Sequence, residues 1–178
     1  MLFDSILRGY PINSFMLWKI SDAEIKSGYK FYEFITAYRE FFAENNKDID
    51  TKGVPDFEAV IDGQQRLTSL YIGLRGSYAY KMPRKWWKDT EDCLPTRKLY
   101  LYLGAAVKPQ YDNQKAFDFR FLSKSDLEKY NKAQDGSIWF EVGQILDMDS
   151  TKKVMRYLMD NNLDENDYAY DTLSTLYE

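Results

Sequence analysis

A short polar segment near the middle of the chain combines residue types that can bind phosphate. The segment consists of Asp62, Gly63, Gln64, Gln65 and Arg66. The apolar run of residues 57–61 precedes it and a helical pattern follows it to about residue 76, so the expected order is strand, tight turn, helix. This order brings the first helical N–H groups to the end of a buried strand. Those groups lack acceptors within the helix and lie at the positive end of its dipole, which favours an anion such as phosphate.

The side chains of this segment suit the same ligand. Gly63 permits a positive φ and a close approach of the backbone to a ligand. Arg66 shares one side of the helix with Ser69, and its planar guanidinium can bind phosphate through two hydrogen bonds. Asp62 fits three roles: a helix N-cap, a ligand of Mg²⁺ beside a phosphate, or a group that orients an attacking water. The alternative for the whole segment is a capped helix start with solvated polar side chains.

A second candidate site combines basic and aromatic side chains. Residues 75–98 contain seven basic and three acidic residues, interleaved with tyrosines and two adjacent tryptophans. Basic groups neutralise phosphates and flat rings stack on bases, so this segment could contact single-stranded nucleic acid or a flipped base. The candidate residues are Arg84, Lys85, Trp86, Trp87 and Lys88. The alternative is a loop whose tryptophans pack on the core and whose charges are solvated.

The composition excludes several kinds of chemistry. The 178 residues include no histidine, which rules out a Ser-His-Asp triad, a Cys-His pair and an imidazole-ligated metal. The one cysteine, Cys93, can form neither an internal disulfide nor a cysteine zinc cluster. The net charge of -4 gives no chain-wide attraction to polyanions, so any contact with nucleic acid must be local. Residues 147–178 carry eight acidic and three basic residues, and nucleic acid is expected to avoid them.

The chain is expected to be soluble and cytoplasmic, with no membrane partner. Asp4, Arg8 and the turn at residues 9–11 interrupt the apolar pattern near the start, so no signal peptide or membrane span is predicted. A single cysteine fits a reducing compartment. The length allows one ordinary domain or a fragment of a larger one.

The hydrophobic patterns predict an α+β fold with mixed helices and strands. Helices are expected over residues 2–8, 30–42, 64–76, 125 onward, 150–161 and 165–177. Strands are expected over residues 15–20, 57–61, 99–103, 117–121 and 138–142. The continuous apolar run at 15–20 is typical of a strand buried on both faces, and the aromatic stripe at 30–42 is typical of the core face of a helix. Residues 78–98 are expected to form a long connection.

The polar segment and its helix resemble a known family. Residues 62–70 match all nine positions of DGQQR-[LI]-T-x-L, the signature of the N-terminal domain of GmrSD-type restriction endonucleases, long catalogued as a domain of unknown function. Residues 7–19 resemble the family's helix, G-x-P-I turn and following strand. More distantly the family is similar to ParB-like and sulfiredoxin-like folds, in which a strand, a turn with glycine and arginine, and a helix bind nucleotide phosphates. The resemblance covers residues 1 to about 145, and residues 146–178 are expected to form a helical extension.

The resemblance implies a function. It implies a ParB-like nucleotide-binding domain over residues 1–145, with a small mixed sheet flanked by helices. Such a domain would bind and hydrolyse a nucleoside triphosphate with Mg²⁺ and gate DNA cleavage by an HNH-type nuclease domain or subunit, in modification-dependent restriction and phage defence. The implied catalytic residues are Asp62, Gln65 and Arg66, with Asp62 as the Mg²⁺ ligand. The implied phosphate-binding residues are Gly63, Gln64, Gln65, Arg66, Thr68 and Ser69. The alternatives are a non-catalytic DNA-binding module and an inactive remnant.

Two departures from the family pattern accompany the resemblance. Family members usually open with an I-P-x-Y-Q-R-x-Y-x-W element whose Gln and Arg approach the same site, and this sequence begins after that element. We therefore expect a chain that is truncated at both ends and that, without histidine, does not itself carry the HNH chemistry. The sulfiredoxin reaction needs a cysteine in the turn, whereas Cys93 lies about thirty residues later, so redox catalysis is not expected.

Overall fold

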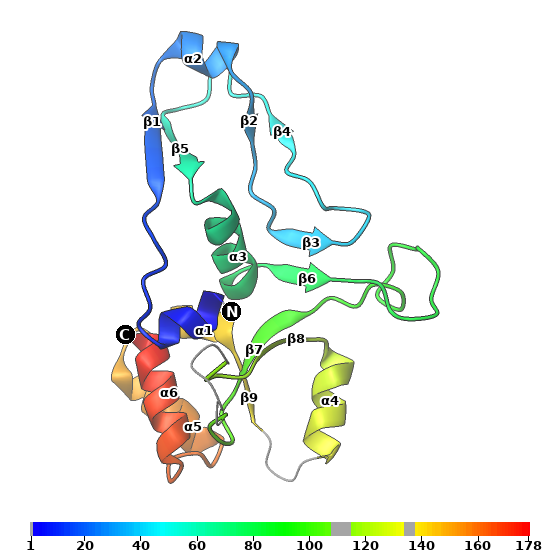
Figure 1. The fold of residues 1–178 in the computed structure, drawn as a ribbon, viewed down its shortest axis with the longest axis vertical. Helices are drawn as coiled ribbons and strands as arrows, with labels where there is room; N and C mark the ends of the chain where they lie inside the picture. Colours follow the sequence, from blue (N-terminus) through cyan, green and yellow to red (C-terminus); the bar gives the residue numbers. More distant parts are fainter. Residues whose placement is uncertain (1, 108–114, 134–137) are drawn as a thin grey trace.

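The chain folds into a body that carries the main core and an arm that projects from it (Figure 1). The computed structural model describes residues 2–107, 115–133 and 138–178. The arm contains β1, α2, β2, β4 and β5, and the body contains α1, α4, α5, α6 and the sheet of β7, β8 and β9. The helix α3 and the strands β3 and β6 lie between the two parts (Figure 1).

The arm consists of two small hairpin-like sheets joined by a short helix. β1 (Met16–Ile20) pairs antiparallel with β5 (Phe57–Asp62). β2 (Phe31–Tyr32) pairs antiparallel with β4 (Asp48–Ile49). Between them, α2 (Ala23–Gly28) is capped by Asp22, whose side chain accepts from the N–H groups of Glu24 and Ile25. Lys26 of α2 donates to Asp56 at 3.0 Å and so ties this helix to the chain that enters β5.

The middle part links the arm to the body. α3 (Gln64–Leu74) follows β5 after a single residue, Gly63. β3 (Ala37–Arg39) and β6 (Ser77–Ala79) pair in parallel, and the rings of Tyr38 and Tyr78 stack with their centroids 4.7 Å apart.

The body is a three-stranded antiparallel sheet covered by helices. The strand order is β8 (Phe119–Leu122), β7 (Lys98–Tyr102), β9 (Trp139–Glu141). The covering elements are α1 (Leu2–Leu7), the 3-10 helix η1 (Val142–Asp147), α5 (Thr151–Asp160) and α6 (Asp167–Tyr177). The buried core side chains are Leu7, Leu99, Leu101, Leu103, Phe140, Val142, Ile145, Val154, Leu158, Leu163, Ala169 and Leu173. Alternate residues of β7 thus face one core that also takes in both C-terminal helices.

The helix α4 (Lys124–Ala133) begins with a reciprocal cap. Asp126 accepts hydrogen bonds from the N–H and hydroxyl of Ser123 at 3.0 and 2.7 Å, and its own N–H donates to the Ser123 hydroxyl at 3.2 Å. Ser123 and Asp126 therefore form the capping box of this helix, two residues before the start predicted at residue 125.

Most of the predicted elements are confirmed. The predicted helices at 2–8, 64–76, 125 onward, 150–161 and 165–177 correspond to α1, α3, α4, α5 and α6. The predicted strands at 57–61, 99–103, 117–121 and 138–142 correspond to β5, β7, β8 and β9. The α+β class is confirmed, while a ParB-like core stays a prediction. The domain boundary predicted near residue 145 falls within η1 and also stays a prediction, although residues on both sides of it share one core.

The helix predicted over residues 30–42 is wrong. This segment contains β2 and β3, and Phe41 has a φ of 70°, which a right-handed helix does not allow. The aromatic spacing fitted a helix, but aromatic and β-branched residues also favour strands, and the pairing partners lie in distant segments. β4 supplies the partner of β2, and β6 supplies the partner of β3. β6 itself lies at the edge of the predicted connection 78–98.

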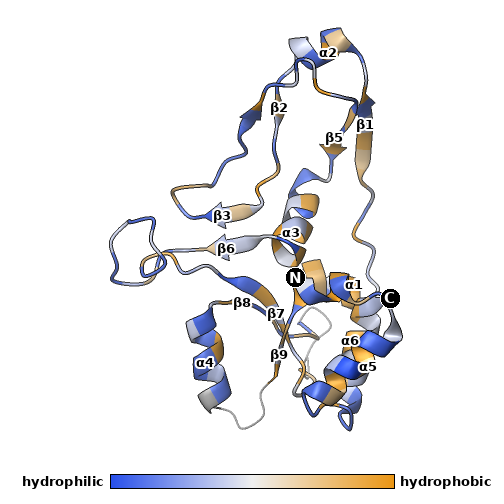
Figure 2. Ribbon diagram, turned by 180° about the vertical axis from the view of Figure 1, so that it is seen from behind, coloured by the Kyte–Doolittle hydropathy of each residue, from blue (hydrophilic) through white to orange (hydrophobic). Residues whose placement is uncertain are grey.

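The prediction that residues 15–20 form a strand buried on both faces is half wrong. The strand exists as β1, but of its residues only Ile20 is buried. β1 pairs with β5 alone in a two-stranded sheet, and its first four residues are exposed. Figure 2 shows that β1 and β5 are largely apolar although they lie in the arm.

Among the described residues, no helix combines the length and the apolar character needed to cross a membrane.

The body and the arm should respond differently to the same substitution. We expect Leu101→Ala to lower the free energy of unfolding by about 2–5 kcal/mol, because Leu101 is 0% exposed in the main core. We expect the matched Leu17→Ala to change it by about 0.5 kcal/mol or less, because Leu17 is 52% exposed on β1. Urea denaturation measures both values. Equal losses for the two variants would contradict this division of the fold.

Candidate functional site

The signature segment forms a strand, a one-residue turn and a helix. β5 ends at Asp62, Gly63 takes a left-handed conformation with φ 84° and ψ 11°, and α3 begins at Gln64. The carbonyl of Gly63 accepts from the N–H of Leu67 at 2.9 Å. Gly63 is therefore the N-cap, with no side-chain cap, and the interpretation of Asp62 as the N-cap is wrong. The first N–H groups of α3 have no hydrogen-bond acceptor within their own helix, and they lie at the turn.

Position 63 strongly favours glycine. A side chain at φ 84° is strained by its own backbone. A Cβ atom built there would also lie 2.6 Å from Cδ1 of Phe15, which is well inside van der Waals contact. The ring of Phe15 thus packs against the open side of the turn, and the two segments of the family resemblance meet at this point.

Arg66 connects the turn to the chain that leads into β1. Its Nη1 donates to the carbonyl of Ile12 at 2.5 Å, and its Nη2 lies 3.4 Å from Oδ2 of Asp62. The guanidinium also lies over the Phe15 ring, 5.2 Å from its centroid. The arginine fork is therefore divided between a backbone carbonyl and a carboxylate. The long distance to Asp62 makes that ion pair the weaker of the two polar contacts.

A pocket of about 320 Å³ lies at the turn. It is lined by Ile61, Asp62, Gly63, Gln64, Gln65 and Arg66. The side chain of Asp62 is 66% exposed there, so its carboxylate faces water. The structure thus brings together the first five predicted site residues. Thr68 and Ser69 lie one turn further along α3, where the hydroxyl of Ser69 donates to the carbonyl of Gln65 at 2.8 Å.

The sequence did not single out Ile12 and Phe15 as parts of this site. Both lie in residues 7–19, the second segment that resembles the family, and that resemblance was the available signal. Their contact with Arg66 and Gly63 joins positions about fifty residues apart, which local patterns do not reveal.

The basic and aromatic segment forms an exposed loop between β6 and β7. Trp86 is 81% exposed, so the alternative in which both tryptophans pack on the core does not hold for it. Trp87 lies 5.5 Å from the ring of Phe41, centroid to centroid. Lys85 pairs with Asp92 at 2.7 Å, whereas Arg84 and Lys88 form no ion pair within the part of the chain that the structure describes. The loop thus presents free positive charge beside an exposed indole.

Two other residues of this segment are structural. Arg97 is 2% exposed, lies 3.6 Å over the Tyr80 ring and donates to the carbonyls of Tyr80 and Pro95. It therefore contributes no positive charge to a binding surface. Cys93 is buried, at 6% exposure.

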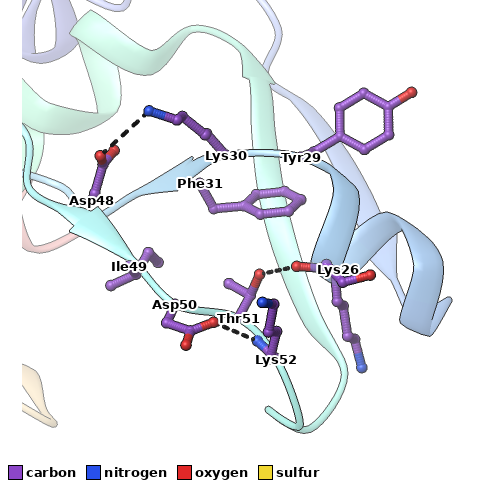
Figure 3. Close-up of a pocket in the computed structure, with 10 residues that line it drawn as sticks. Lys26, Tyr29, Lys30, Phe31, Asp48, Ile49, Asp50, Thr51 and Lys52 are labelled. Atoms are coloured by element: carbon purple, nitrogen blue, oxygen red, sulfur yellow. Dashed lines mark hydrogen bonds and ion pairs between the residues drawn. The ribbon is translucent and has the colours of Figure 1, made fainter.

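Two further pockets lie away from the signature. One of about 260 Å³ lies at the tip of the arm, and Figure 3 shows Lys30 and Asp48 reaching toward one another beside it. Another of about 780 Å³ lies beneath the basic loop and includes Tyr100 and Glu141. Burial and the nearby Glu141 raise the pKa of Tyr100 to about 12, so this phenol stays protonated at neutral pH and is no general base.

These features define a small α+β domain organised around a strand, glycine turn and helix with a pocket at the turn. The chain belongs to the family described as GmrSD restriction endonuclease, N-terminal domain, whose model matches residues 1–178. The match extends beyond residue 145, where the sequence resemblance faded, and confirms the family. It makes the chain part of a restriction endonuclease system. A comparison with curated proteins gave no match.

The packing of Phe15 on the turn can be tested with two glycines. We expect Gly9→Ala to lower the free energy of unfolding by about 1–2 kcal/mol, because Gly9 has φ 69° but open space around its Cα. Gly63→Ala should lower it by more, because the added methyl also meets Phe15. Urea denaturation of the two variants measures the difference. Equal effects would mean that Phe15 does not constrain the turn.

Proposed function

We propose that this chain is the nucleotide-binding regulatory domain of its restriction system and that it binds a nucleoside triphosphate with Mg²⁺ at the turn between β5 and α3. The observation that supports this most is the position of the family signature: Gly63, at φ 84°, brings the first amides of α3 to a pocket that also contains Arg66 and Asp62. Amides at a helix N-terminus and a guanidinium are suited to phosphate oxygens.

Binding of phosphate would change the contacts of Arg66. A charged phosphate oxygen is a stronger acceptor than the carbonyl of Ile12, which Arg66 now binds. If the guanidinium turns to the phosphate, residues 12–15 lose one of their anchors on the turn. The same residues lead directly into β1, so occupancy of the site can be transmitted to the arm.

The residues at the turn also fit Mg²⁺. This ion prefers oxygen ligands and is commonly held by one or two carboxylates together with substrate phosphates and waters. Asp62 offers an exposed carboxylate beside the proposed phosphate position. No group of three His, Cys, Asp or Glu side chains within the described residues could hold a metal by itself. Mg²⁺ would therefore be held jointly by Asp62 and the nucleotide.

Hydrolysis, and its coupling to DNA cleavage, complete the proposal. Asp62 and Gln65 are the groups at the turn that can orient a water for attack on the terminal phosphate. Cleavage of DNA would be carried out by an HNH-type nuclease domain or subunit, because this chain contains no histidine. Hydrolysis would then gate that partner.

The phosphate site can be tested by thermal unfolding with ligand. We expect a mixture of the four common nucleoside triphosphates with Mg²⁺ to raise the Tm of the wild-type chain, because the ligand binds the folded state alone. Arg66→Ala should weaken binding on the order of tenfold or more, as expected for loss of a charge-assisted hydrogen bond. The matched control is Arg75→Ala at the other end of α3, which should bind normally. Asp62→Asn should reduce the dependence of binding on Mg²⁺.

Two results would contradict the proposal. One is a wild-type Tm that does not change with any nucleotide and Mg²⁺. The other is an Arg66→Ala variant that remains folded by circular dichroism and binds as tightly as Arg75→Ala.

A second function, DNA contact, is supported by the loop between β6 and β7. Trp86 is the most exposed large apolar residue of the described chain, and Arg84 and Lys88 stand beside it in sequence. An exposed indole next to unpaired cations suits stacking on a base with neutralisation of its phosphates. In a domain that gates DNA cleavage, this loop would be the part that touches DNA.

Salt and mutation should reveal this contact. We expect binding to single-stranded DNA that weakens steeply with salt, and we expect both Trp86→Ala and Lys88→Ala to weaken it on the order of fivefold or more. The control is Lys152→Ala in the acidic C-terminal region, which should bind as the wild type does. Fluorescence anisotropy at several salt concentrations measures all four proteins. Binding that is absent or independent of salt would exclude the loop as a DNA contact.

A further inference from the structure

A groove of about 520 Å³ adjoins the pocket at the signature turn. It lies in the arm, between the sheet of β1 and β5 and the sheet of β2 and β4. Ile61 and Gln64 line both cavities, so the groove and the pocket are adjacent. The carboxamide of Gln64 is held at this junction, because its Nε2 donates to the carbonyl of Val60 at 2.8 Å.

One wall of the groove is an apolar face of the first sheet. Trp18 pairs with Ala59 in the strand register, and side chains two residues apart in a strand share a face. Phe57 and Ala59 therefore lie on the same face as Trp18, and all three line the groove together with Ile61, which lies at a register shift of the two strands. Trp18 is 41% exposed, so part of its ring is in contact with solvent.

The opposite wall is aromatic and is held in place. Phe31 and Phe34 line it, and the ring of Phe31 meets that of Phe57 edge to face at 5.0 Å. Asn46 donates to the carbonyl of Glu33 at 2.7 Å. This hydrogen bond links the residue that follows β2 to the segment that leads into β4. The two walls are therefore connected by packing and do not depend on a ligand to stay together.

The rim of the groove is polar. Glu33, Asn46 and Glu58 supply carboxylate and amide groups around the aromatic interior. An aromatic interior with hydrogen-bonding groups at its edge suits a planar heterocycle, which stacks by its face and is recognised by its edge. Lys30, which forms an ion pair with Asp48, also lines the groove.

We propose that this groove binds the base of the nucleotide whose phosphates bind at the turn, with the ring of Trp18 as a stacking surface. The proposal rests on the proposed function: the two cavities adjoin at Ile61 and Gln64, so one nucleotide would place its phosphates at the turn and its base in the groove. The arm is then the part of the domain that recognises the base. Nucleotide binding would also bury part of the apolar surface that β1 and β5 now expose.

A ligand without a base separates the two halves of the site. Isothermal titration calorimetry with Mg²⁺ compares inorganic tripolyphosphate with each of the four common nucleoside triphosphates. We expect the wild-type chain to bind at least one nucleotide on the order of tenfold or more tighter than tripolyphosphate, because stacking adds to phosphate binding. Trp18→Ala should remove that advantage and leave tripolyphosphate affinity unchanged, whereas Arg66→Ala should weaken both ligands.

Further variants test whether an effect of Trp18→Ala comes from loss of the stacking ring or from a general loss of structure. Trp18→Phe keeps a stacking ring and should retain most of the advantage of the nucleotide. Tyr170→Ala removes an exposed aromatic ring from α6, in the body, and should bind both ligands as the wild type does. Quenching of tryptophan fluorescence by nucleotide, lost in Trp18→Phe but not in Tyr170→Ala, would locate the base at Trp18 directly.

The outcomes distinguish the two proposals. If the wild-type chain binds tripolyphosphate and nucleotides equally, or if Trp18→Ala binds both as the wild type does, the phosphate site stands and the base site is overturned. The groove would then be free to serve another partner, such as a protein segment. If neither ligand binds the wild-type chain, the phosphate site itself fails and the base site fails with it.

Discussion

The left-handed turn at Gly63 is the constraint on which the site depends. β5 ends and α3 begins within one residue, and glycine is strongly favoured there at φ 84° with the Phe15 ring against it. Arg66 then fixes the carbonyl of Ile12, so the chain that leads into β1 is attached to the same turn. Because β1 pairs with β5, the turn determines the position of the first sheet of the arm as well as the direction of the first helical amides.

The body and the arm differ in how much apolar surface they bury. The main core gathers β7, η1, α1 and the two C-terminal helices, and its buried side chains supply the hydrophobic contribution to folding. The arm has two-stranded sheets and exposes most of β1. Regions with few buried apolar contacts open at lower cost, and binding surfaces are often found there. The signature pocket lies at the junction, where a stable helix meets this looser part.

The elements that the sequence predicted well are those specified by local pattern. The body strand alternates as a strand should, with Leu99 and Leu101 buried, and the signature helix begins directly after its glycine turn. The helix predicted over residues 30–42 failed because its aromatic spacing satisfied a helical period, while the real partners were distant strands. The exposure of β1 could not be foreseen either, since an apolar run does not say whether a second layer covers it.

The sequence by itself determined the family, the glycine that the turn needs, and the polar residues of the pocket, because these follow from consecutive positions. The tertiary structure decided what those residues touch. Arg66 donates to the carbonyl of Ile12, 54 positions away. Arg97 is buried over the ring of Tyr80, although these two residues belong to the segment 75–98, whose composition predicts an exposed basic surface. The groove beside Trp18 likewise exists only when two small sheets, each built from strands far apart in sequence, pack together. Contacts between segments far apart in sequence depend on the whole chain, so no local pattern contains them.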